Sequence, residues 1–486
     1  MRVALGLAAN DVLFPVVGFA FLYLLGLAAS FGNGLRLLGL SYLTGWALLG
    51  SALSIGLMLG LPLTILSVVA VAAVLVVGCV LVRRHRHAPP PADPAPVAGS
   101  ALNRWITRIG AALLGVGVLA AMITAARGEW NPASDYDALW FWLPKAATIY
   151  YAHGLDPQLW RVIAHLEYPP LMPAMTAVTF AFTGGFHPSL IPFQQALLGA
   201  AFVVAAFALL DRFVPRWLSI PALALLGTAP WFWAKLESPM PDQTLAYLIA
   251  AAMLTSAIWL CEPRTAWLGL ALVFLAAASL IKLEGVLFGT ALAVVVLGAG
   301  LARYRRAGAR AGILLLGPGA ILLWHAWLGW HGLRGSSPDY DLAKLADPGF
   351  LEGRTARLHY SLHAMARAGN RLLLDALPLG GLGPLGRVET PALIVGLCAL
   401  LFFAGRRAPA VAAAVGLWLV LAVASLAAIY WIGYPPIISY VQVTVRRVEE
   451  TPAMVTMTLL PLLLALALRA TPTSRQRGES GPEAPD

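Results

Sequence analysis

Long apolar runs follow one another along almost the whole chain, with short polar segments between them. A transmembrane helix needs about 20 apolar residues to cross the hydrocarbon core of a bilayer. About thirteen runs are near that length: residues 12–30, 37–59, 62–82, 105–126, 190–211, 217–234, 243–261, 265–281, 285–301, 311–329, 390–404, 408–431 and 453–469. The pattern predicts an all-α polytopic membrane protein.

Composition agrees with this fold class. The 486 residues are 59% hydrophobic and 12% charged, whereas soluble proteins average about 25% charged residues. The net charge of +10 comes largely from arginines between the apolar runs, as expected for cytoplasmic loops, and we therefore expect no nucleic-acid partner. Cys79, Cys261 and Cys398 are far apart in the sequence, which predicts neither a disulfide framework nor a metal cluster.

The arginine clusters predict the orientation of the chain. If the spans alternate as given above, every cluster falls on one side of the membrane, which should be the cytoplasm. The N-terminus would then lie outside. The clusters are Arg83, Arg84, Arg86 and Arg104; Arg212 and Arg216; Arg264; Arg303 to Arg310; Arg406 and Arg407; and Arg469, Arg475 and Arg477.

Most acidic residues fall on the opposite, extracytoplasmic side. They lie on segments 127–189, 235–242, 281–285, 331–389 and 433–452. Within the first segment, the aromatic-rich stretch at 137–154 predicts a helix lying in the membrane interface. The Pro-led stretch at 168–185 predicts a second interfacial or re-entrant helix. Polar groups gathered on one face of a membrane protein indicate a site there.

The apolar runs and polar segments divide the chain into five parts. These are N-terminal spans with a cytoplasmic Pro/Ala-rich linker (1–104), a central transmembrane module (105–330), an extracytoplasmic loop (331–389), C-terminal spans (390–470) and a cytoplasmic tail (471–486). The polar composition of the tail predicts disorder.

Four acidic positions on the extracytoplasmic side are candidates for catalysis: Asp137, Glu167, Glu237 and Asp242. Two of them, Asp137 and Asp242, open predicted helices, where the helix dipole and free N–H groups stabilise a carboxylate. Simple N-capping is therefore the alternative interpretation for both. We expect Asp135, two residues before Asp137, to be a cap or a spectator.

Lys282 and Glu284 stand where two apolar spans meet, in "LAAASLIKLEGVLFG". Ionisable groups at such a depth are costly and are usually paired or functional. The functional interpretation is a lysine that binds phosphate; the alternatives are a mutual ion pair, or snorkelling of the side chains to the interface.

Arg446 and Arg447 lie on the extracytoplasmic side, against the orientation rule. Arginines in such a position suggest binding of a phosphate or carboxylate. The alternative is a local network with the neighbouring Glu449 and Glu450.

His359 and His363 are four residues apart, so that on a helix they would share a face. A two-histidine metal site and a solvated helix face are both compatible with this spacing, and the solvated face is favoured because the sequence fixes no third ligand. The chain lacks the GxxxxGK[ST], GxSxG and HExxH motifs, which disfavours nucleotide-driven transport and serine or zinc hydrolysis.

At these residues the chain resembles the polytopic GT-C glycosyltransferases, which include protein O-mannosyltransferases, lipid A aminoarabinose transferases and bacterial oligosaccharyltransferases. The similarity covers about residues 105–301, as four patterns in the same order. They read "DALWFWLPKA" (137–146), "EYPPL" (167–171), "DQTLA" (242–246) and "IKLEG" (281–285).

The resemblance implies transfer of a sugar from a polyprenyl-phosphate carrier to a lipid, glycan or protein acceptor, with inversion. Asp137 would be the base that takes the acceptor proton, and the cations would bind the departing phosphate. A divalent cation is used by some members only, so that metal use is left open. The residues implied in substrate binding are Glu167, Asp242, Lys282, Glu284, Arg446 and Arg447.

The resemblance also implies an integral protein of a bacterial inner membrane with an extracytoplasmic active site. Two other functions are weighed against the transferase. A transporter or lipid flippase of cell-envelope precursors would place polar groups near the bilayer midplane in two related halves, and the chain shows no convincing internal repeat. A non-catalytic subunit of an envelope complex is the third interpretation.

Overall fold

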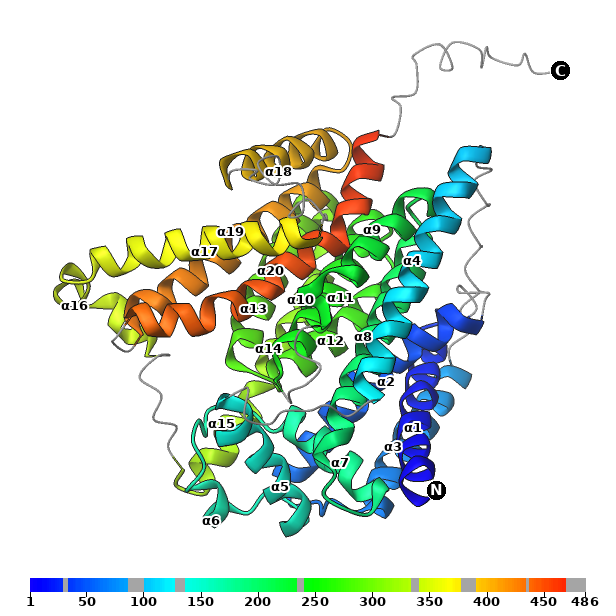
Figure 1. Cartoon of the computed structure of the whole chain (residues 1–486), viewed down its shortest axis with the longest axis vertical. Helices are drawn as coiled ribbons and strands as arrows, with labels where there is room; N and C mark the ends of the chain where they lie inside the picture. Colours follow the sequence, from blue (N-terminus) through cyan, green and yellow to red (C-terminus); the bar gives the residue numbers. More distant parts are fainter. Residues whose placement is uncertain are drawn as a thin grey trace.

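The computed structural model describes residues 1–28, 34–85, 100–126, 136–233, 240–333, 341–376, 390–433 and 437–468. Within these ranges the chain forms helices and no strands, which confirms the all-α prediction (Figure 1). The cytoplasmic linker and the C-terminal tail that the sequence predicts lie largely outside these ranges, as do Asp135 and Glu237.

The α-helices are α1 (Arg2–Leu24), α2 (Gly34–Met58), α3 (Ile65–Arg84), α4 (Ala101–Ala126), α5 (Leu143–Ala152), α6 (Pro157–Trp160), α7 (Leu171–Thr183), α8 (Ile191–Leu210), α9 (Arg216–Thr228), α10 (Pro230–Trp233), α11 (Asp242–Cys261), α12 (Thr265–Ser279), α13 (Leu283–Tyr304), α14 (Leu316–Gly319), α15 (Ile321–Trp330), α16 (Pro348–Glu352), α17 (Thr355–Ala376), α18 (Thr390–Gly405), α19 (Pro409–Ile432) and α20 (Ile437–Leu468). The π-helical turn η3 spans Ala138–Trp142, and the 3-10 helices are η4 (Pro188–Leu190), η5 (Arg305–Leu315) and η7 (Leu342–Ala346).

In the described part of the chain, 9 helices are long and apolar enough to cross a membrane. Helices α7, α12 and the described apolar part of α18, Ile394–Gly405, are apolar but shorter. These helices indicate a membrane protein, and the count of about thirteen spans stays a prediction.

One apolar stretch, Leu283–Trp330, has 48 residues, more than twice the length of about 20 that one crossing needs. The chain turns back within it at Arg305, whose φ is 52°. Gly308 then lies directly against the backbone of Gly300. This reversal fits the two separate spans that the sequence predicts for 285–301 and 311–329.

Helices α1 and α2 pack closely because glycines face each other across their contact. A Cβ on Gly18 would lie 1.8 Å from the Ser41 carbonyl oxygen, and one on Gly45 would lie 1.8 Å from the Phe14 carbonyl oxygen. Small residues allow such backbone approach between membrane helices. The N-terminal pair therefore forms a tight unit, which also contacts α7 and α8.

Helix α11 runs through the centre of the helical assembly (Figure 1). Every residue from Asp242 to Leu260 is buried, as expected for a helix that is apolar on all sides. It contacts α8, α12, α13 and α20. Because α11 begins at Asp242, the fold places this carboxylate in the interior of the protein.

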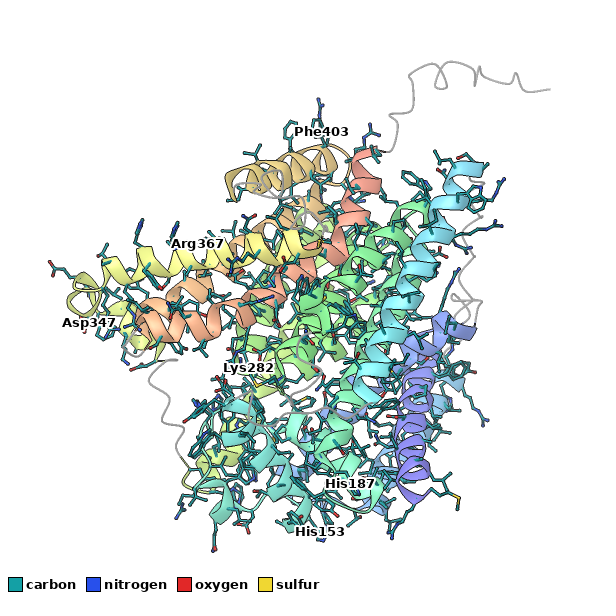
Figure 2. All side chains as sticks on the ribbon, viewed as in Figure 1. His153, His187, Lys282, Asp347, Arg367 and Phe403 are labelled. Carbon is teal, nitrogen blue, oxygen red and sulfur yellow. The ribbon has the colours of Figure 1, made fainter. Side chains whose placement is uncertain are left out.

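The stretch after Asp137 forms η3 and then α5, near the end of the molecule where His153 and His187 lie (Figure 2). Tyr136, just before Asp137, and Trp140 and Tyr151 on this stretch are exposed, a distribution compatible with a helix in the membrane interface. Helix α7 differs from an amphipathic surface helix, because all its residues from Leu171 to Phe180 are buried. The positions of both helices relative to a membrane surface stay predictions.

Candidate functional site

Lys282 lies at the start of α13 and holds two buried carboxylates. Its Nζ donates a hydrogen bond of 2.9 Å to Asp242 Oδ1 and lies 3.0 Å from Glu284 Oε1. The three side chains are 3–6% exposed. Burial opposes the charge of Lys282, but the two carboxylates outweigh it and raise the pKa of the lysine. Lys282 is therefore an ammonium ion at neutral pH.

The close approach of α12 and α13 brings these residues together. A Cβ on Gly285 would lie 2.1 Å from the Ala278 carbonyl oxygen, so that only glycine fits directly after Glu284. Lys282 itself is extended, with φ −156° and ψ 154°. It is buried and is labelled near the middle of the view in Figure 2. The glycine in "IKLEG" is thus required by the close packing of α13 against α12.

Asp137 forms a third ion pair of the site, at 2.7 Å from Arg447 of α20. The Asp137 carboxylate makes no N-cap hydrogen bond to η3, and the N-cap position of α11 is held by Pro241, one residue before Asp242. Both carboxylates contact cations, and N-capping of η3 is not the role of Asp137 in this structure. A π-helical turn directly after Asp137 is a feature that often accompanies functional sites.

The three ion pairs belong to one cluster, because the charge of Arg447 acts on both Asp242 and Lys282. We call Asp137, Asp242, Lys282, Glu284 and Arg447 the central cluster. The residues come from four elements that are as much as 310 positions apart in the sequence. Five of the implied site residues are therefore brought together by the fold.

The central cluster has more carboxylates than cations, three against two. Glu449, two residues further along α20, is 5% exposed and lies near Tyr430, as do Glu284 and Arg447. Within the described residues, however, there is no group of three or more His, Cys, Asp or Glu side chains placed to bind a metal ion. The geometry therefore gives no metal site here.

Glu167 lies outside the central cluster. Its Oε1 is 3.0 Å from His165 Nδ1. Burial would raise the pKa of Glu167, but the hydrogen bond from His165 and the charges of His165 and Lys145 lower it. Glu167 is therefore ionised beside a histidine and a lysine, rather than beside Asp242.

Tyr168 connects these two regions, although the sequence did not single it out. Lys282 Nζ lies 5.8 Å from the centre of its ring, and the Tyr168 phenol is also near enough to Arg447 to interact with it electrostatically. The ring of Tyr168 also stacks on that of Trp142, with 5.4 Å between the ring centres. A single tyrosine gives no local signal of such a position. Its place directly after Glu167, in "EYPPL", is the sequence feature that points to it.

Arg446 points away from the central cluster. Its side chain is 58% exposed and lies 3.9 Å from Asp375 of α17. The described ion pairs of Arg446 and Arg447 thus join other helices rather than the neighbouring glutamates. His359 and His363 are both exposed on α17, as expected for a solvated helix face.

The central cluster combines a carboxylate that can accept a proton with two cations that can bind an anion. Comparison with protein-family models, curated proteins and solved structures finds no match to this chain.

Proposed function

We propose that this protein is a membrane glycosyltransferase that moves a sugar from a polyprenyl-phosphate carrier to an acceptor at the extracytoplasmic face. The observation that carries the proposal is the central cluster, in which Asp137 is paired with Arg447 beside Lys282. A sugar transferase of this kind needs a base for the acceptor and positive charge for the leaving phosphate.

The ion pair between Asp137 and Arg447 suggests how the base is released. A phosphate that binds Arg447 and Lys282 competes with Asp137 for the guanidinium group, because Arg binds phosphate in a bidentate way. Asp137 is then free to take the proton of the acceptor hydroxyl. The acceptor oxygen bonds to the anomeric carbon as the carbon–oxygen bond to the phosphate breaks, and the polyprenyl phosphate leaves with inversion at the anomeric carbon.

The other residues of the cluster have supporting roles in this proposal. Asp242 and Glu284 keep Lys282 charged and fix its Nζ. Glu167, with His165, stands at the side of Tyr168, where it would orient the acceptor or the sugar. Arg446 lies outside the cluster and has no role in the proposed step.

The test compares Asp137→Asn with Asp375→Asn, a matched change at the exposed partner of Arg446. Envelope glycans and lipid-linked sugars are measured by mass spectrometry in cells that lack the protein, contain it, or contain either variant. The protein should create a glycan that Asp137→Asn reduces at least about a hundredfold, in line with loss of a general base. Asp375→Asn should retain it. Retained product in Asp137→Asn would sink Asp137 as the base.

A transporter or lipid flippase of envelope precursors is the alternative, and Asp11 is the observation that favours it. This carboxylate lies within α1 and accepts hydrogen bonds from Tyr42, at 3.1 Å, and from Gln194, at 3.0 Å. Ionisable groups within membrane helices often mark transport paths. Counter-transport of a polyprenyl-phosphate sugar by protein-containing liposomes, with no sugar transferred to any acceptor, would favour this alternative.

A further inference from the structure

Lys145 is fully buried on α5, although the proposed reaction does not use it. Four aromatic rings surround its Nζ: Phe141 at 5.7 Å, Trp142 at 5.6 Å, Trp160 at 5.2 Å and Tyr168 at 5.7 Å between Nζ and each ring centre. Aromatic faces within about 6 Å attract an ammonium group. Burying a lysine without a carboxylate in direct contact costs stability. The presence of Lys145 among these four rings therefore calls for a function.

The amine of Lys145 binds the backbone of the turn that precedes α7. It donates to the carbonyl oxygens of His165, at 2.5 Å, and of Tyr168, at 3.4 Å. Burial lowers the pKa of Lys145 to about 7, while the charge of Glu167 opposes this shift. A neutral amine still has two N–H groups, one for each carbonyl, so that the contact persists in both protonation states.

The turn needs such support because its backbone is strained. His165 has a φ of 58°, a left-handed conformation that is unfavourable for residues other than glycine. The Trp324 indole donates to the carbonyl oxygen of Leu166 at 3.1 Å. The three carbonyl groups of residues 165, 166 and 168 are therefore all held by side chains from other elements.

The position of this turn sets the position of Tyr168 in the candidate site. Tyr168 contacts both lysines, with Lys145 Nζ at 5.7 Å and Lys282 Nζ at 5.8 Å from its ring centre. Three residues after the turn, the Leu171 amide donates to the carbonyl oxygen of Leu280, two residues before Lys282, at 3.1 Å. The turn 165–168 is thus connected to the region of Lys282 in two ways, through the ring of Tyr168 and through the backbone hydrogen bond of Leu171.

We propose that Lys145 is a positioning residue of the transferase, which clamps the turn 165–168 so that Tyr168 forms one wall of the phosphate-binding cluster around Lys282 and Arg447. Lys145 itself touches no member of the central cluster. Its role in catalysis rests on the proposed function, whereas the clamp is a property of the fold alone.

The experiment uses Lys145→Met, which keeps the length of the side chain but has no donor, and Lys145→Arg, which restores donors in a similar volume. Tyr304→Phe is the control, because it removes a hydrogen bond of 2.7 Å to the Leu260 carbonyl oxygen at the far ends of α11 and α13. Hydrogen exchange of the peptide that covers 165–168 is measured on purified protein. Binding of polyprenyl phosphate, and KM and kcat where sugar is transferred, are measured beside it.

We expect Lys145→Met to speed exchange in this peptide at least about tenfold, the factor for 1.4 kcal/mol of lost local stability. Binding of polyprenyl phosphate should weaken by a similar factor, and KM for the lipid-linked sugar should rise more than kcat falls. Lys145→Arg should recover most of both, and Tyr304→Phe should change neither. If Lys145→Met does not fold, Lys145→Gln replaces it, since its polar amide is too short to reach both carbonyls.

Unchanged exchange in the donor-free variant would overturn the clamp. Faster exchange with unchanged binding of polyprenyl phosphate would overturn the positioning role, because the clamp would then serve the fold only. If the wild-type protein transfers no sugar, the proposed function fails, while exchange and polyprenyl-phosphate binding still decide the inference about Lys145.

Discussion

At the residue scale, Lys282 is the side chain on which the central cluster depends. It is the cation in direct contact with two carboxylates, and all three groups are nearly inaccessible. We expect Lys282→Met to lower the free energy of unfolding by about 3–5 kcal/mol, because it leaves buried carboxylates without a partner. Thermal unfolding in detergent measures the change.

The control for this prediction removes the carboxylates as well. Lys282→Met combined with Asp242→Asn and Glu284→Gln should recover most of the lost stability, since the triple variant buries no unpaired charge. A single variant as stable as the wild type would show that the three groups are not coupled.

Lys145 gives a second prediction at this scale, on pH. Its pKa is about 7 in the fold, against an ordinary value of 10.5. Between these values the unfolded chain keeps the proton and the folded chain does not, so that the contribution of Lys145 to stability rises with pH from about 7. From pH 7 to pH 9, wild type should gain up to about 2 kcal/mol over Lys145→Met, at 1.4 kcal/mol per pKa unit. A difference in unfolding temperature that is independent of pH would contradict this.

At the scale of the element, α13 depends on one glycine for its contact with α12. We expect Gly285→Ala to destabilise the protein by about 1–3 kcal/mol, because its Cβ would overlap the Ala278 carbonyl oxygen and force the helices apart. The same change at Gly298, on the same helix with open space around it, should be neutral or stabilising by up to about 1 kcal/mol. Thermal unfolding of the two variants checks the pair, and equal effects would show that the contact does not limit packing.

The α-helical elements follow from the apolar runs, but their lengths do not. Residues 265–281 are predicted as a span, and the helix there, α12, ends at Ser279 so that Lys282 can take an extended conformation. Helix α7 is predicted as an interfacial or re-entrant helix from its prolines and length, and its burial from Leu171 to Phe180 is not visible in its own sequence. Local sequence specifies that a helix forms, whereas its depth and neighbours depend on the packing of distant segments.

At the scale of the whole molecule, the same limit applies to the site. The sequence singles out Asp137, Asp242 and Lys282 because charged residues are rare in apolar surroundings. It does not distinguish Arg447 from Arg446, since the two are adjacent and only the direction of α20 decides which reaches Asp137. The sequence assigns no role to Lys145, because its partners are backbone carbonyl groups and aromatic rings that come together only in the folded chain.

The orientation of the chain in the membrane is the prediction that the proposed function most depends on. Arginine placement puts the segment around Tyr151 outside and the segment around Ala309 inside. Both residues are exposed, and α13, of 22 residues, extends about 33 Å at 1.5 Å per residue, from the central cluster to the second segment. In a background without cysteine, a membrane-impermeant thiol reagent should label Tyr151→Cys in intact cells and Ala309→Cys only after the membrane is opened. The opposite result would place the Asp137 end in the cytoplasm, and transfer at the extracytoplasmic face would then be ruled out.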